Sequence, residues 1–138
     1  MRFTDLAPAS ALAATLVLSA PVAAQDLSAP LSADAFEEMV EGRYFTHFQD
    51  GVPYAIEAYF PGRRTIWLIF GDPCIEGEWY ERDGYICFVY EDSEDVEHCW
   101  HYLARDDGAL VARPRGNPFS EIELFDDGEP LTCPGYGV

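Results

Sequence analysis

From residue 43 onward, short apolar and aromatic segments alternate with clusters of turn-forming residues. The turn signals are Asp50-Gly51, Pro61-Gly62, Gly71-Asp72-Pro73, Asp83-Gly84, Asp106-Asp107-Gly108 and Gly116-Asn117-Pro118. This rhythm is typical of an antiparallel meander. Parallel strands need long crossover connections, so the pattern excludes a doubly wound α/β fold. We predict a mainly β fold, an antiparallel meander of about seven or eight strands that forms a small barrel or half-barrel.

One amphipathic helix is predicted over residues 32–41, just before the first strand. Ser32 is a suitable N-cap and Gly42 ends the helical pattern. The apolar stripe of the helix consists of Phe36, Met39 and Val40. We expect this stripe to pack on the sheet. The helix and the strands together form one domain over residues 32–127.

The turns also predict which residues face each other across neighbouring strands, because turn length fixes the register. Read as a two-residue type II turn, Pro61-Gly62 pairs Ala58 with Thr65 and Ile56 with Trp67. The pairs predicted by the next two turns are Ile69 with Ile75, Trp67 with Gly77, Trp79 with Phe88 and Gly77 with Tyr90. All these turns give the same parity, so the residues can be divided between two faces.

The predicted interior face is apolar and aromatic. It carries Phe45, His47, Ile56, Ala58, Trp67, Ile69, Ile75, Gly77, Trp79, Ile86, Phe88 and Tyr90. Gly77 lies between two aromatic positions, where a missing side chain leaves room for rings to lie over the backbone. The predicted outer face carries Glu57, Tyr59, Glu76, Glu78, Tyr80 and Arg82.

Strand residues 64–70 also place three apolar side chains on the outer face. These are Ile66, Leu68 and Phe70. Leaving them in water would forfeit about 25 cal/mol per Å² of apolar area, so something should cover them. We expect the helical stripe over residues 32–41 to be that cover.

Four cysteines allow three disulfide connectivities in an oxidising compartment. A turn centred near Ser93 places Cys87 opposite Cys99 on the outer face, which favours that pair. Cys74 and Cys87 lie out of alignment and cannot meet the Cα separation of a disulfide. Cys74 is then left for Cys133, and this bond would tie the Pro- and Gly-rich tail, residues 128–138, back onto the domain.

Residues 1–24 read as a cleavable export signal. The apolar stretch ends in Val22-Ala23-Ala24 before Gln25, with small residues where a signal peptidase needs them. We expect cleavage near Ala24-Gln25, a linker over residues 25–31, and a periplasmic or secreted mature protein. The stretch is shorter than a membrane span, so we expect no membrane insertion after cleavage.

The chain is strongly acidic, with a net charge of -17, and has no lysine. Removing residues 1–24 leaves this charge unchanged, since they hold one arginine and one acidic residue, Arg2 and Asp5. Such a surface repels nucleic-acid phosphates and anionic lipids. It favours basic proteins, cations or saline surroundings.

The candidate ligand-binding residues lie on the predicted interior face. They are His47, Trp67, Trp79, Tyr90 and His98. The two histidines could hold a metal or form the polar end of an apolar pocket. His101 has odd spacing from His98 and falls on the opposite face of the strand. Two hydrogen-bonded core histidines are the simpler interpretation, so we predict no metal site and no cofactor.

No motif in the chain names a reaction. The serines lack a G-x-S-x-G context, and no Gly-rich phosphate loop or Walker motif occurs. Carboxylates such as Glu57 and Glu76 could supply acid/base chemistry, but a chain with 25 acidic residues always brings some together. We therefore predict no catalytic residues.

Three short segments of the predicted strands match a G-x-W, C-x-x-Y, C-W pattern. They are Gly77-Glu78-Trp79-Tyr80, Ile86-Cys87-Phe88-Val89-Tyr90 and Cys99-Trp100. This pattern resembles one found in small exported proteins of unknown function from Gram-negative proteobacteria. The resemblance covers about residues 42–115. It implies a lipocalin-like strand pattern and a small antiparallel barrel or half-barrel, and it brings no catalytic residues.

We interpret the chain as an exported periplasmic binding or interaction module rather than an enzyme. Its partner could be a small apolar ligand held in the aromatic interior. One alternative is an acidic inhibitor or docking protein for a basic enzyme, with affinity that falls as salt screens the charges. Another is a metal- or cofactor-binding enzyme using His47 and His98. A structural envelope protein without ligand is the last alternative.

Overall fold

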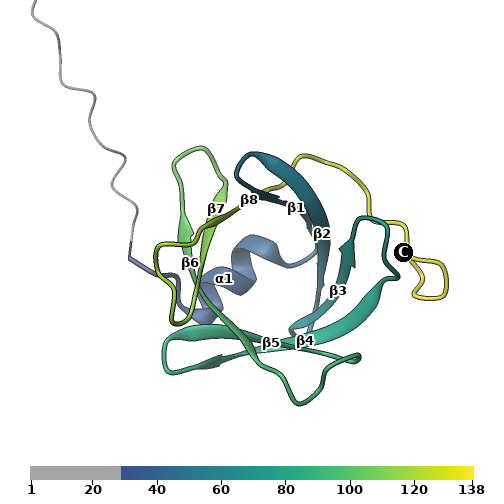
Figure 1. Ribbon diagram of the computed structural model, residues 1–138, viewed down its shortest axis with the longest axis horizontal. Coiled ribbons are helices and arrows are strands. Elements are labelled where there is room, and N and C mark those ends of the chain that lie inside the picture. Colours follow the sequence, from purple (N-terminus) through teal and green to yellow (C-terminus); the bar gives the residue numbers. More distant parts are fainter. Residues whose placement is uncertain (1–28) are drawn as a thin grey trace, which may run out of the picture.

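A computed structural model describes residues 29–138, so the predicted export signal and most of the predicted linker lie outside the described residues. Eight antiparallel strands follow one another around a closed barrel (Figure 1), and one helix precedes them. The elements are α1 (Ala33–Val40), β1 (Tyr44–Gln49), β2 (Val52–Phe60), β3 (Arg64–Ile69), β4 (Ile75–Arg82), β5 (Tyr85–Tyr90), β6 (His98–Ala104), β7 (Leu110–Pro114) and β8 (Ile122–Phe125). The predicted mainly β meander with one N-terminal helix is confirmed.

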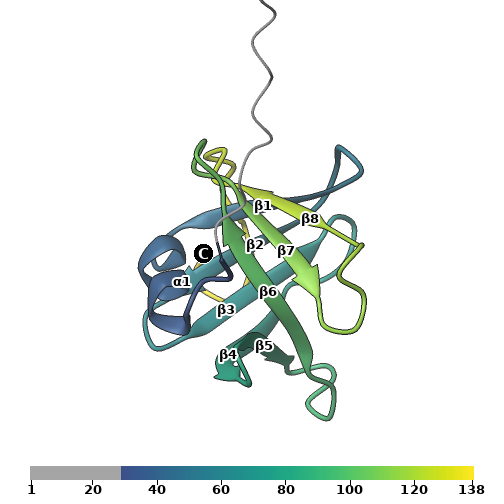
Figure 2. The same cartoon turned by 90° about the vertical axis from the view of Figure 1, so that its left-hand side faces the viewer.

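The barrel closes through pairing of the first strand with the last. Thr46 pairs with Phe125 and His47 pairs with Leu124. Because the strands alternate in direction, the hairpin loops of β1–β2, β3–β4, β5–β6 and β7–β8 gather at one end of the barrel (Figure 2). Helix α1 lies at the other end.

The predicted register is confirmed across the two hairpins that join β4, β5 and β6. Trp79 pairs with Phe88, and Gly77 pairs with Tyr90. The Asp83-Gly84 turn gives this register because both residues adopt positive φ, as a two-residue hairpin turn requires.

The predicted register between β2 and β3 is wrong by one residue. The loop spans residues 61–63, so Phe60 pairs with Arg64 and Trp67 pairs with Glu57 instead of Ile56. Gly62 and Arg63 both have positive φ in this loop. A shift of one residue exchanges the two faces of a strand.

This exchange reverses the predicted positions of four residues. Glu57 and Tyr59 face the interior, whereas Ile56 and Ala58 belong to a cluster on the outside of the barrel. The predicted pairing of Ile69 with Ile75 is also wrong, because Ile75 pairs with Trp67. The register between β3 and β4 is thus shifted by two residues from the prediction. Because side chains alternate between the two faces, a shift of two residues leaves each side chain on its predicted face.

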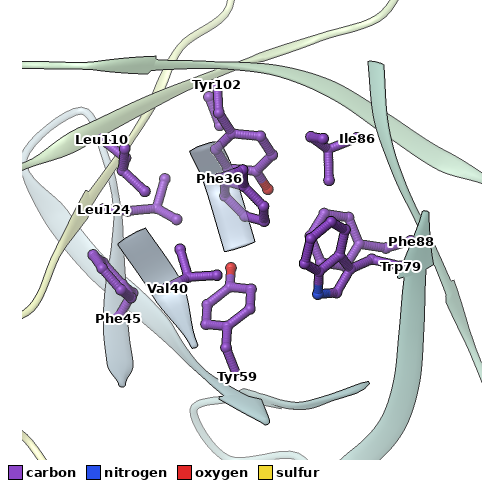
Figure 3. Packing of buried hydrophobic residues seen from close by; sticks show 11 residues of the cluster. Phe36, Val40, Phe45, Tyr59, Trp79, Ile86, Phe88, Tyr102, Leu110 and Leu124 are labelled. Atoms are coloured by element: carbon purple, nitrogen blue, oxygen red, sulfur yellow. The ribbon is translucent and has the colours of Figure 1, made fainter. Parts of the chain in front are cut away.

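Helix α1 covers one end of the barrel core instead of the outer face of β3. Ser32 caps it, accepting a hydrogen bond from the Ala35 backbone N–H at 3.2 Å, as predicted. Phe36 and Val40 are fully buried among interior side chains (Figure 3). The ring of Phe36 lies 5.1 Å from that of Trp79 and 4.3 Å from that of Tyr102.

Arg63 fixes the helix against the β2–β3 loop. Its guanidinium donates hydrogen bonds to Glu37 and Asp34 of α1, with Nη2 3.0 Å from each carboxylate. The same guanidinium lies 4.9 Å from the centre of the Trp79 ring. The extra residue of the loop therefore both sets the register of β2 and holds the helix at this end of the barrel.

The C-terminal tail covers the outer apolar face that the helix was predicted to cover. Leu131 and Cys133 are buried against Ile56, Ala58 and Ile66, with Leu68 packed beside them. Phe70, which was also expected to be covered, remains 48% exposed.

Both predicted disulfides are present, Cys74–Cys133 and Cys87–Cys99. The first bond holds the tail against the start of β4. Two disulfides are typical of proteins from an oxidising compartment. In residues 29–138 we find no helix with the length and apolar character of a membrane span.

Gly77 gives the first testable prediction. A Cβ added there would lie 2.6 Å from Cδ1 of Tyr90 and 3.0 Å from the Val89 carbonyl oxygen. Gly77→Ala should therefore lower the free energy of unfolding by about 1–3 kcal/mol, as overpacking does, measured by urea denaturation. In a Tyr90→Ala background the same substitution should cost less, because the ring is gone. Equal costs in both backgrounds would contradict the proposed clash.

Candidate functional site

The barrel interior holds a cavity of about 380 Å³ beyond the layer that packs on α1. On β1, for example, Phe45 belongs to the packed layer whereas His47 lines the cavity. The walls are mostly aromatic, formed by Tyr54, Trp67, Phe88, Tyr90, Trp100 and Tyr102. Ile69, Asp92 and His98 line the side near the hairpin loops.

Glu57 is the buried carboxyl group of this cavity. It is only 1% exposed and accepts hydrogen bonds from three hydroxyl groups. Tyr59 donates to Oε2 at 2.8 Å, and Thr65 and Tyr90 donate to Oε1 at 2.8 and 2.9 Å. Burial raises the pKa of Glu57 from 4.5 to about 7, although these hydrogen bonds favour the charged form and oppose the rise.

The Thr65 hydroxyl can form hydrogen bonds with both the ionised and the protonated form of Glu57. The Thr65 hydroxyl oxygen lies 2.8 Å from Glu57 Oε1 and 2.8 Å from the Ala58 carbonyl oxygen. A hydroxyl carries one hydrogen, so it can donate to only one of them at a time. Ionised Glu57 accepts that hydrogen, whereas protonated Glu57 can donate its own proton to Thr65, which then donates to Ala58.

His47 lies beside Glu57 and has an unsatisfied nitrogen. Its Nε2 is buried and has no hydrogen-bond partner among residues 29–138. The nearest carboxylate oxygen, Glu57 Oε2, is 3.7 Å away, which is too long for a hydrogen bond. Burial lowers the pKa of His47 from 6.5 to about 3, so the imidazole is neutral at pH 7.

Aromatic rings surround this polar pair. The Trp67 ring centre is 4.8 Å from that of His47, with the planes steeply inclined. Tyr54 and Tyr90 have ring centres 6.1 and 6.4 Å from that of Trp67. The result is an apolar chamber whose buried polar groups are concentrated at Glu57 and His47.

Comparisons with protein-family models, curated proteins and solved structures find no match for this chain.

Four of the five predicted ligand-binding residues line the cavity, and the fifth does not. His47, Trp67, Tyr90 and His98 come together around it. Trp79 lies instead in the packed layer against Phe36. His98 is exposed, with its ring centre 5.9 Å from that of Tyr90.

Glu57 and Tyr54, two polar residues of the cavity, are absent from the predicted ligand-binding set. Glu57 was placed outside by the one-residue error in the β2–β3 loop. Tyr54 reaches the cavity through a β-bulge, because the β1–β2 register shifts between His47 and Phe48. A bulge redirects a side chain in this way. The three-residue reading of Pro61-Gly62-Arg63 would have found Glu57, but the bulge has no clear sequence signal.

The histidines do not form a metal cluster with Glu57. Within the described part of the chain, the only close group of three candidate ligands is Cys87, Glu97 and Cys99. Its two cysteines are bonded to each other in a disulfide, so their thiolates cannot bind a metal.

Proposed function

We propose that this chain is an exported, non-enzymatic binding protein that takes a small, largely apolar molecule into its barrel. The observation that carries the proposal is the aromatic cavity of about 380 Å³ with Glu57 and His47 buried in its wall. Ligand sites are typically cavities of this size, mostly apolar, with a few polar groups that orient the ligand.

The contrast between the two ends of the barrel supports a binding role. Protein interiors are normally close-packed, and the end near α1 meets that standard with Phe36 inserted among four aromatic rings. The other end holds a cavity instead. An eight-stranded barrel is just wide enough either to be filled by side chains or to hold one small ligand. This chain has both arrangements, one at each end.

The two disulfides support an exported location, periplasmic or secreted. Stabilising cross-links of this kind persist outside the reducing cytosol. The export signal proposed for residues 1–24 agrees with this location. We propose in addition that the ligand binds inside the closed antiparallel barrel, in a lipocalin-like manner.

The proposal is tested with N-phenyl-1-naphthylamine, a neutral apolar dye whose fluorescence rises in apolar surroundings. The protein should bind it saturably. Ile75→Trp places a larger side chain in the cavity wall and should weaken binding by about tenfold or more. The control is Val96→Trp, at a residue that is 47% exposed and outside the cavity lining.

The Val96→Trp variant should bind the dye as the wild type does, and circular dichroism should show the same fold for all three proteins. Absence of saturable binding to the wild type, or equal binding by the Ile75→Trp variant, would contradict the proposed cavity function.

A further inference from the structure

We propose that the ligand is a small amine, bound as its ammonium form, with the nitrogen held between Glu57 Oε2 and His47 Nε2. This inference rests on the proposed binding function and adds the chemical class of the ligand. It depends on how the two side chains are placed in the cavity.

The two atoms form an incomplete pair of acceptors. Glu57 Oε1 already accepts from Thr65 and Tyr90, whereas within residues 29–138 Oε2 accepts only from Tyr59. A carboxylate oxygen has room for a second hydrogen bond. His47 Nε2 is buried with no partner in the described residues, and it is 3.7 Å from Oε2.

An ammonium group fits these two atoms better than other polar groups do. It has three donors and no acceptor, as a lysine side chain shows. One N–H can donate to Glu57 Oε2, and a second can donate to Nε2 of a neutral imidazole that carries its proton on Nδ1. A single ligand nitrogen would thus satisfy the unpartnered atom of His47 and neutralise the charge of Glu57.

The rings around this pair provide the rest of an amine site. The ring centres of Trp67 and Tyr54 lie 4.8 and 6.3 Å from that of His47, and the Tyr90 hydroxyl donates to Glu57 Oε1 at 2.9 Å. A cation within about 6 Å of an aromatic ring face is attracted by the ring, most strongly by tryptophan. The same rings can stack on the apolar part of the ligand.

The charges of the cavity and of the whole chain disfavour an anionic ligand. No arginine of the described residues lines the cavity, and the chain has no lysine at all. The lining includes two carboxylates, Glu57 and Asp92. The net charge of -17 should raise the local concentration of cations and repel anions.

Binding of the ammonium form requires ionised Glu57, so it should depend on pH. The titratable groups that face Glu57 are His47, Tyr54, Tyr59, Tyr90 and Tyr102. Burial raises the pKa of each of these tyrosines and lowers the pKa of His47, so all five are neutral near pH 7. Glu57, whose pKa is about 7, is then the group whose proton the amine displaces.

The experiment compares three probes of one shape by isothermal titration calorimetry with the full chain, disulfides intact. They are 2-phenylethylamine, 2-phenylethanol and phenylacetate, which are cationic, neutral and anionic at about pH 8. The wild type should bind the amine about tenfold or more tightly than the alcohol, because a hydrogen bond to a charged group is stronger than a neutral one. Phenylacetate should bind least.

Glu57→Gln, which keeps the side-chain shape, should remove the preference for the amine over the alcohol. A second measurement needs no variant. Amine affinity of the wild type should fall by about tenfold per pH unit below the pKa of Glu57, whereas alcohol affinity should change little.

A wild type that binds the alcohol as tightly as the amine overturns the inference, and so does a Glu57→Gln variant that keeps the preference. Either result leaves the cavity function intact if the naphthylamine dye still binds. Failure of the dye and of all three probes overturns both proposals.

Discussion

Replacing Phe36 with alanine is expected to lower the free energy of unfolding by about 3–5 kcal/mol, the range for removing a buried aromatic ring. Phe36 is fully buried and contacts the rings of Tyr59, Trp79, Phe88 and Tyr102. Its loss would leave a hole that the barrel strands, tied by hydrogen bonds around a closed ring, cannot easily close. Urea denaturation followed by circular dichroism measures the change.

Met39→Ala is the control on the same helix. Met39 is only partly buried at the edge of the packed layer, so its replacement should cost no more than about 2 kcal/mol. If both variants lost the same small amount, Phe36 would not be the residue that fills this end of the barrel.

The sequence predicted the fold well where the residues of a turn are compatible with only one loop length and therefore with one strand register. Asp83-Gly84 is a strong signal for a two-residue hairpin, and it fixed the register of β4 and β5. The pairing of Cys87 with Cys99 followed from the neighbouring hairpin and left Cys74 for Cys133, and both bonds are present. Local rules sufficed here because no distant segment competes with them.

The β2–β3 hairpin could not be predicted in the same way, because Pro61-Gly62 fits loops of two or three residues. Side-chain pattern usually decides such cases, but β2 carries apolar residues on both faces. Ile56 is buried under the C-terminal tail, and Tyr59 is buried inside the barrel. The three-residue loop also lets Arg63 pair with Asp34 and Glu37 of α1, a contact that the local sequence does not indicate.

The position of α1 was mispredicted for a related reason. An apolar helical stripe indicates that the helix packs on something apolar, but not on what. Two apolar surfaces were available to the helix, the outer face of β3 around Ile66 and the open end of the barrel. The C-terminal tail covers the outer face, where the Cys74–Cys133 disulfide holds it, and the helix covers the end of the barrel. Closure of the barrel is a property of all eight strands, so no single segment indicates it.

The buried pair Glu57 and His47 should give two opposite pH dependences of stability. The pKa of Glu57 is raised to about 7 in the folded protein, so its contribution is complete below about pH 4.5 and is lost as the pH rises through 7. The pKa of His47 is lowered to about 3, so its contribution is complete above pH 6.5 and is lost as the pH falls through 3.

Two variants separate these contributions. The difference in unfolding free energy between wild type and Glu57→Gln should fall by about 3 kcal/mol from pH 4.5 to 7, at about 1.4 kcal/mol per pKa unit. The difference between wild type and His47→Gln should fall as the pH is lowered from 6.5 toward 4.5. Urea denaturation at a series of pH values, at constant ionic strength, measures both. The surface carboxylates contribute the same pH dependence to the wild type and to each variant, so the comparison removes their contribution.

An ion pair between Glu57 and His47 would reverse both signs. Mutual attraction would hold the pKa of Glu57 below 4.5 and that of His47 above 6.5. The free energy of unfolding of the wild type would then increase relative to that of Glu57→Gln as the pH rises through the acid range. We expect the neutral pair, because the 3.7 Å separation lacks a hydrogen bond to offset the desolvation of two charges. A bound ammonium group would supply that missing partner. Below pH 7, where Glu57 is mostly protonated in the empty cavity, binding of an amine is therefore expected to ionise Glu57, whereas His47 stays neutral in both states.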